Sequence, residues 1–158
     1  MTGGAKPGES FVELKGLVKN YRLGQTVVSA LRGVSLELHR GEFTAVIGAS
    51  GSGKSTLLNM IGCIDDPDSG SIKFDGVEVT QLTDDAKSHL RNQKIGFIFQ
   101  SFNLIPVLSV EENVELPLLI NPGISVAERG ERVAAAIADV SLSAFTKNRP
   151  DQRSGGQR

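Results

Sequence analysis

The stretch that decides the fold is Gly48-Ala49-Ser50-Gly51-Ser52-Gly53-Lys54-Ser55-Thr56, which meets the pattern G-x-x-x-x-G-K-[ST]. Residues 43–47 before it (FTAVI) are short, apolar and rich in β-favouring side chains, which predicts a buried parallel strand. Residues 57–61 after it (LLNMI) predict a helix. A strand, this loop and a helix together are the context in which the pattern binds nucleotide phosphates.

The chemistry of a triphosphate explains the spacing of this loop. Several negative charges need converging backbone N–H groups, and residues with little or no side chain let the backbone come close. The loop leads into a helix N-terminus, whose free N–H groups and dipole favour an anion. Lys54 adds a charge for the β- and γ-phosphates, and Ser55 offers a hydroxyl to Mg²⁺. We therefore expect ATP and Mg²⁺ to be bound by Gly48, Ala49, Ser50, Gly51, Ser52, Gly53, Lys54, Ser55 and Thr56.

Composition limits the classes of protein. The chain has 158 residues, and its 39% hydrophobic content is ordinary for a soluble globular protein. Seventeen basic against eighteen acidic residues give a net charge of −1, which argues against a nucleic-acid partner. The single Cys63 cannot form an internal disulfide, and its apolar neighbours predict packing rather than reactivity. We see no signal peptide and no membrane-spanning stretch, so a membrane role would require a partner.

The first part of the chain predicts antiparallel strands. We expect residues 1–9 to form a flexible tail, then a strand over 11–21, a turn at Gly24 and further strands over 27–31 and 34–38. Their short connections favour antiparallel pairing. The dipeptide Asp75-Gly76 predicts a hairpin between residues 71–74 and 77–79. A helix over 86–91 is expected to begin at residues 83–85, and a second buried strand over 94–99 to end at Gln100.

The remaining residues predict helices. Residues 101–108 are apolar without a period and contain a proline, which is typical of a docking loop. Ser109 with Glu112 predicts a capping box for a helix through residue 116, ended by Pro117 and a turn over 121–123. The same pattern at Ser125 predicts a helix over 126–140, with one face formed by Val133, Ile137 and Val140.

Three further motifs are informative because of the order in which they occur along the chain. Tyr21 alone would be an ordinary core residue, Gln100 an ordinary surface residue and Ser154-Gly155-Gly156-Gln157 a linker. In this order around residues 48–56, however, they make the chain resemble the ATP-binding subunits of ABC transporters, from about residue 11 to the end. Residues 61–65 (IGCID) and 101–106 (SFNLIP) look most like the branch that serves lipoprotein release and macrolide export.

The resemblance implies an α/β P-loop NTPase core with an N-terminal antiparallel β subdomain over residues 10–100, followed by a Q-loop and part of a helical subdomain over 101–158. Tyr21 would stack on the adenine. Gln100 would act with Lys54 in catalysis, at Mg²⁺ or the attacking water. A second ATP-binding subunit, dimerised head to tail, would present its ATP to Ser154, Gly155, Gly156 and Gln157. The subunit would lie at the cytoplasmic face of the membrane, held by a permease.

Two departures from the family pattern are visible. Arg153 stands where the family usually has leucine, and the Asp-Glu strand and histidine switch that follow in the family are not in this sequence. We therefore expect a truncated, N-terminal portion that does not hydrolyse ATP by itself. Alternatives are an ABC-type ATPase without a membrane partner, a non-hydrolysing nucleotide-binding module and a small-molecule or nucleotide kinase. The kinase would need an arginine-lined acceptor site, which we do not see.

Overall fold

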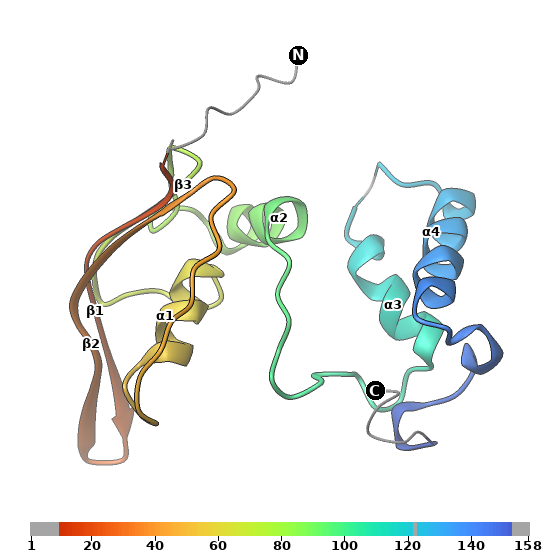
Figure 1. Ribbon diagram of the computed structural model, residues 1–158, viewed down its shortest axis with the longest axis horizontal. Coiled ribbons are helices and arrows are strands. Elements are labelled where there is room, and N and C mark those ends of the chain that lie inside the picture. Colours follow the sequence, from red (N-terminus) through yellow and green to blue (C-terminus); the bar gives the residue numbers. More distant parts are fainter. Residues whose placement is uncertain (1–9, 122, 153–158) are drawn as a thin grey trace. The chain divides into compact units, whose positions relative to one another are not determined.

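The computed structural model describes residues 10–121 and 123–152. The chain divides into two compact units, Met1–Phe97 and Ile98–Arg158. The first unit holds a sheet and two helices, and the second holds two helices and two short 3-10 turns (Figure 1). The expected flexible tail over residues 1–9 lies outside the described residues.

The sheet of the first unit is antiparallel, as the short connections predict. Its strands are β1 (Ser10–Leu23), β2 (Thr26–His39), β3 (Ser69–Phe74) and β4 (Val77–Glu78), in the spatial order β2-β1-β3-β4 (Figure 1). The two strands expected over 27–31 and 34–38 are one continuous strand. The pairing passes from Leu17 with Val34 to Val18 with Arg32, so Gly33 is an extra residue in a bulge. A φ of 82° at Gly33 lets the strand continue through this bulge.

The hairpin between β3 and β4 is confirmed. Asp75 and Gly76 have φ values of 53° and 78°, the two positive angles that a two-residue turn with right-handed strand twist requires. The pairs Lys73 with Glu78 and Phe74 with Val77 close the ladder on either side.

One hydrophobic core holds the sheet against helix α1 (Lys54–Ile61). Leu17 of β1 and Met60 of α1 are both 0% exposed. The other buried members are Val12, Leu14, Leu31, Cys63, Ile72, Phe74 and Val79. Burial raises the pKa of the Cys63 thiol above its ordinary value, which keeps the thiol protonated and unreactive. Cys63 is therefore a packing residue, as predicted.

Helix α2 (Asp84–Lys94) begins where the sequence predicts. Thr83 is its N-cap, and the Thr83 side chain accepts a hydrogen bond from the backbone N–H of Ala86. Lys87 donates to both carboxylate oxygens of Asp66, at 2.7 and 2.8 Å. Arg91 donates to the carbonyl oxygen of Cys63 at 2.6 Å. These contacts fasten α2 to the loop that follows α1.

The two buried strands expected at residues 43–47 and 94–99 are wrong. Neither segment is a strand in the structure, and the side chains of Phe43, Ile47 and Ile98 are 94%, 91% and 97% exposed. A parallel strand exists only when a neighbouring strand accepts and donates its backbone hydrogen bonds. Within residues 10–121 and 123–152, no strand pairs with either segment. Both segments are apolar, but an apolar composition does not supply the neighbouring strand that pairing requires.

The second unit is helical. Its elements are α3 (Val110–Leu119), α4 (Val126–Asp139), η1 (Ser143–Phe145) and η2 (Pro150–Gln152). Ser109 and Glu112 form the predicted capping box. The Ser125 side chain accepts a hydrogen bond from the backbone N–H of Glu128 at the start of α4.

Two details of these helices differ from expectation. Pro117 lies inside α3 and does not end it: its fixed φ is compatible with a helix, although the helix loses the hydrogen bond that a backbone N–H would donate at this position. On α4, Val133 and Ile137 are buried as predicted, whereas Val140 is 62% exposed. Val140 follows the last helical residue with a φ of −103°, so it no longer keeps the helical spacing.

Candidate functional site

The phosphate loop runs into α1 through two glycines in left-handed conformations. Gly51 has a φ of 77°, and Gly53, the N-cap of α1, has a φ of 91°. A Cβ atom on Gly53 would lie 2.5 Å from the carbonyl oxygen of Ala30, so the loop is packed directly against the backbone of β2. Figure 1 shows this end of α1 beside β2. The sheet thus fixes the position at which the loop turns into the helix.

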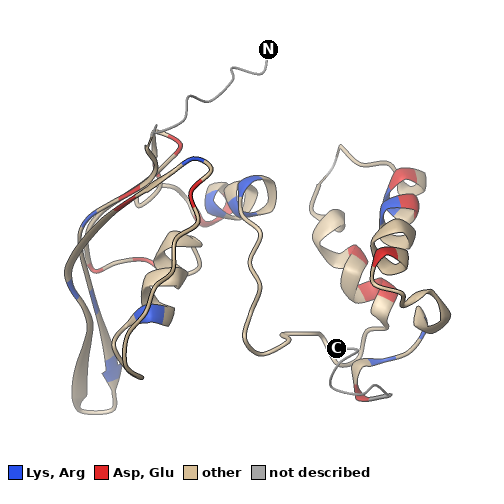
Figure 2. Ribbon diagram, viewed as in Figure 1, with Lys and Arg blue, Asp and Glu red and all other residues tan. Residues whose placement is uncertain are grey.

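The ammonium of Lys54 is folded back over this loop. Its Nζ donates to the carbonyl oxygens of Gly48 and Ala49, at 2.9 and 2.7 Å. An ammonium has three protons, so two hold it over the loop and one is left for an anion. The first turn of α1, which the structure describes completely, carries no acidic side chain. Figure 2 shows the basic colour at this end of α1. The helix dipole and Lys54 therefore both favour a bound phosphate.

The side chains here also fit Mg²⁺. Ser55 lies in the first turn of α1 and is exposed, and its hydroxyl oxygen is the hard donor that Mg²⁺ prefers. The described residues contain no group of three or more His, Cys, Asp or Glu side chains able to hold a metal alone.

Tyr21, near the end of β1, is held by a pair of charged side chains. Its hydroxyl donates to Asp65 Oδ2 at 2.8 Å, and Lys19 Nζ donates to Asp65 Oδ1 at 2.7 Å. The same ammonium lies 5.3 Å from the centroid of the Tyr21 ring. Thr56 is the last residue of the phosphate loop, and its side chain also interacts with the Tyr21 phenol. The structure therefore brings Tyr21 beside the phosphate loop.

The ionisation of this cluster follows from its contacts. Burial and the hydrogen bond to Asp65 raise the pKa of the Tyr21 phenol, while Thr56 acts in the opposite direction. Partial burial opposes ionisation of Asp65, but the hydrogen bonds from Lys19 and Tyr21 outweigh it, and the pKa of the carboxyl lies below its ordinary value. Asp65 is thus a carboxylate that accepts three hydrogen bonds, from Lys19, from Tyr21 and from the backbone N–H of Asp66. In the sequence Asp65 is only the last residue of the stretch 61–65 (IGCID), which assigns it no role at the nucleotide site.

The other predicted site residues do not belong to the described part of the first unit. Gln100 belongs to the second unit and is exposed. Ser154, Gly155, Gly156 and Gln157 lie outside the described residues, as does Arg153. Their roles remain predictions.

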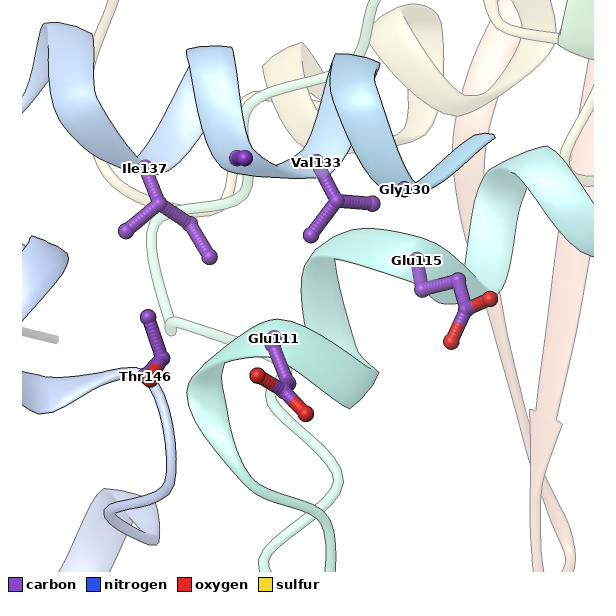
Figure 3. Close-up of a pocket in the computed structure, with 7 residues that line it drawn as sticks. Glu111, Glu115, Gly130, Val133, Ile137 and Thr146 are labelled. Carbon is purple, nitrogen blue, oxygen red and sulfur yellow. The ribbon is translucent and has the colours of Figure 1, made fainter. Parts of the chain in front are cut away.

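A cavity of about 240 Å³ lies in the second unit and belongs to none of the predicted sites. Val133 and Ile137 of α4 and Glu111 and Glu115 of α3 point into it (Figure 3). Gly130, Ala134 and Thr146 complete its lining. Lys147 pairs with Glu111, and Arg129 pairs with Glu115 at 2.6 Å, so both carboxylates are already neutralised. The cavity has no unpaired charge with which to select an ion.

Comparison with known proteins decides the family. The family model described as ABC transporter matches residues 31–158. The chain belongs to this family. Between residues 10 and 152, position 122 aside, the structure has no helix long and apolar enough to cross a membrane.

Several relatives agree with this assignment. The chain is 48% identical over 147 residues to the macrolide export ATP-binding/permease protein MacB of Syntrophobacter fumaroxidans, which covers 92% of this chain and 21% of MacB. It is 43% identical over 149 residues to the uncharacterized ABC transporter ATP-binding protein MJ0796 of Methanocaldococcus jannaschii, covering 92% of this chain and 63% of MJ0796. The chain thus spans about a fifth of the length of MacB and under two thirds of the length of MJ0796.

A solved structure confirms the fold class. The dimeric post-hydrolysis state of the ATP-binding cassette MJ0796, bound to ADP and Pi, is similar with a TM-score of 0.83 and 44% identity, covering 92% of this chain and 64% of that one. The predicted α/β cassette and the likeness to macrolide exporters are both confirmed.

Proposed function

We propose that this chain binds Mg-ATP through residues 48–56 as part of an ABC transporter, and that ATP binding and hydrolysis there drive export through a membrane permease. The observation that carries the proposal is Lys54 held over the phosphate loop by Gly48 and Ala49, at the start of α1. This arrangement aims a cation and a helix N-terminus at one point, as a triphosphate requires.

Each residue of the predicted site has a role in this proposal. Lys54 holds the β- and γ-phosphates, Ser55 holds Mg²⁺ and Tyr21 stacks on the adenine. Gln100 orients the attacking water or contacts Mg²⁺. Ser154, Gly155, Gly156 and Gln157 contact the ATP of a second ATP-binding subunit, so that two subunits close head to tail around two nucleotides. The dimeric MJ0796 structure supports this partner.

The proposal of a membrane partner is based on the names of two relatives. MacB carries a permease in its own name, and so does the pyoverdine export protein PvdT of Pseudomonas aeruginosa, to which the chain is 48% identical. We propose a position at the cytoplasmic face of the membrane, held there by a permease. Nucleic acid is not a proposed partner, because basic and acidic residues are nearly equal in number.

The test of the nucleotide site is Lys54→Ala. A charge-assisted hydrogen bond contributes on the order of 1.5–3 kcal/mol, so affinity for Mg-ATP should fall by at least about tenfold. Titration of the purified chain with a fluorescent ATP analogue measures this. Lys15→Ala is the matched control, since that lysine is 60% exposed on β1 and should leave affinity unchanged. Equal affinity of the Lys54 variant and the parent protein would remove Lys54 from the site.

The proposed permease contact is the apolar loop at residues 101–108. Phe102 is 56% exposed, and Leu104 and Ile105 are 37% and 38% exposed. The Asn113 side chain holds the loop against α3: its Oδ1 accepts from the Ile105 backbone N–H at 2.8 Å, and its Nδ2 donates to the Leu108 carbonyl at 3.1 Å. A fixed apolar surface of this kind suits an amphipathic cytosolic helix of the permease.

The test of this contact replaces Phe102 and Leu104 with serine together. Transport by the assembled transporter should be uncoupled from nucleotide, because apolar contact area is lost while the phosphate loop is untouched. Val126→Ser with Val140→Ser is the matched control, since these residues of the same unit are 76% and 62% exposed. If the Phe102 and Leu104 variant still co-purifies with the permease at parental yield, the docking surface lies elsewhere.

A further inference from the structure

The loop that follows α1 carries a carboxylate with no role in the proposed function so far. Asp65 accepts from the Tyr21 hydroxyl at 2.8 Å through one oxygen and from Lys19 Nζ at 2.7 Å through the other. Its side chain is 32% exposed, and that of Lys19 is only 13% exposed. The bonds therefore lie partly shielded from water, where a charge-assisted contact fixes geometry better than on an open surface.

These bonds fix the ring as well as the hydroxyl. Asp65 holds Lys19, and the Lys19 ammonium lies over the Tyr21 ring, 5.3 Å from its centroid. A cation over one face of an aromatic ring is attracted by it and occupies that face. A base can then stack only on the opposite face. The hydroxyl end is held at the same time, so the ring can neither swing about β1 nor turn over.

From this geometry we infer that Asp65 is a positioning residue for adenine: it holds Tyr21 in one orientation beside the phosphate loop, and so makes binding selective for a nucleotide with a base. This inference rests on the proposed stacking of Tyr21 on adenine. It adds that selectivity for the base depends on Asp65, which lies 44 positions from Tyr21 in the sequence.

A purely structural tie between the loop and β1 is already provided by other residues. Asp68 Oδ2 accepts from the Asn20 backbone N–H at 2.7 Å and from the Asn20 side chain at 2.9 Å. The Asp68 N–H donates to the Val18 carbonyl at 2.8 Å, and Lys19 donates to the Asp66 carbonyl at 2.6 Å. The loop stays attached to β1 without the Tyr21 bond. That bond therefore acts on the ring.

The test compares two ligands, Mg-ATP and magnesium tripolyphosphate, by isothermal titration calorimetry of the purified chain. Asp65→Ala and Tyr21→Phe should each weaken ATP binding about two- to tenfold, the range of one hydrogen bond, and leave tripolyphosphate binding unchanged. The double variant should bind ATP no more weakly than Asp65→Ala alone, because Asp65→Ala already removes the hydrogen bond that Tyr21→Phe deletes. Asp68→Ala is the matched control, since it cuts the neighbouring tie without touching Tyr21 and should leave the ratio of the two affinities unchanged.

A spectroscopic measurement separates positioning from folding. Tyr21 is the only tyrosine, and the chain has no tryptophan, so absorbance of the phenolate reports this side chain alone. Asp65→Ala should lower the pKa of the phenol toward its ordinary value, because the hydrogen bond and the negative charge that raise it are removed. Asp68→Ala should leave that titration unchanged.

The outcomes distinguish the inference from the proposed function. If the parent protein binds tripolyphosphate as tightly as ATP, stacking by Tyr21 is refuted and the inference falls with it. If the parent protein prefers ATP and Asp65→Ala keeps that preference, or if its phenol titrates as in the parent protein, the inference is overturned while stacking survives. An equal loss of both ligands in Asp65→Ala would show a structural role and overturn it as well.

Discussion

Replacing Gly53 with alanine is expected to weaken Mg-ATP binding by on the order of a hundredfold. Gly53 has a φ of 91°, which costs an ordinary residue on the order of 1–3 kcal/mol. The added Cβ would also lie 2.5 Å from the carbonyl oxygen of Ala30. Backbone in a paired strand cannot yield as a flexible side chain can, so the loop must move and α1 loses its N-cap.

The matched control for this prediction is Gly33→Ala. Gly33 has a similar φ of 82° on the same strand as Ala30, but a Cβ there would meet no atom within 4 Å. It therefore carries the conformational strain without the collision, and ATP affinity should stay within a few-fold of the parent protein. Calorimetric titration of both variants with Mg-ATP gives the comparison. Similar losses in the two variants would mean that strain alone matters and that contact with β2 does not fix the loop.

Local signals in the sequence predicted the elements that depend on local chemistry. The turn at Asp75-Gly76, the N-cap at Thr83 and the capping box at Ser109 are each set by residues within four positions of one another, and all three are found in the structure. The antiparallel pairing of β1 with β2 follows from a connection too short for a crossover.

The predictions that proved wrong concern strands whose formation depends on residues distant in the sequence. Residues 43–47 have the composition of a buried strand, yet Phe43 and Ile47 are more than nine-tenths exposed, because β-structure needs a partner that composition does not name. The separation expected between strands 27–31 and 34–38 is also absent, because Gly33 lies in a bulge through which β2 continues.

In the candidate site, too, local sequence predicts one part, the phosphate loop, and does not predict another, the contact of Asp65 with Tyr21. The spacing of Gly48, Gly53 and Lys54 predicts the loop because the proposed phosphate contacts all lie within nine consecutive residues. The role of Asp65 could not be predicted, since its partners lie 44 and 46 positions earlier on another element. In the sequence it is one of several aspartates in a turn. Only the antiparallel sheet and α1 together place it against Tyr21.

The largest effect on stability is expected for Leu17→Ala. Leu17 is 0% exposed at the centre of the core that joins the sheet to α1, and the cavity left by such a truncation typically costs about 2–5 kcal/mol of unfolding free energy. Urea unfolding followed by tyrosine emission measures the first unit specifically, because Tyr21 lies on β1 and is the only tyrosine in a chain without tryptophan.

Leu23→Ala serves as the control for this substitution. Leu23 ends the same strand and is 67% exposed, so its removal takes away little buried area and should change the unfolding free energy by less than about 0.5 kcal/mol. Both variants delete the same atoms from the same strand, so they differ only in how deeply the leucine is buried. If Leu17→Ala lowers the urea midpoint no more than Leu23→Ala does, the core around Leu17 and Met60 does not hold the phosphate-loop helix to the sheet. The positions of Gly53 and Lys54 would then have to be fixed by the contact with Ala30 alone.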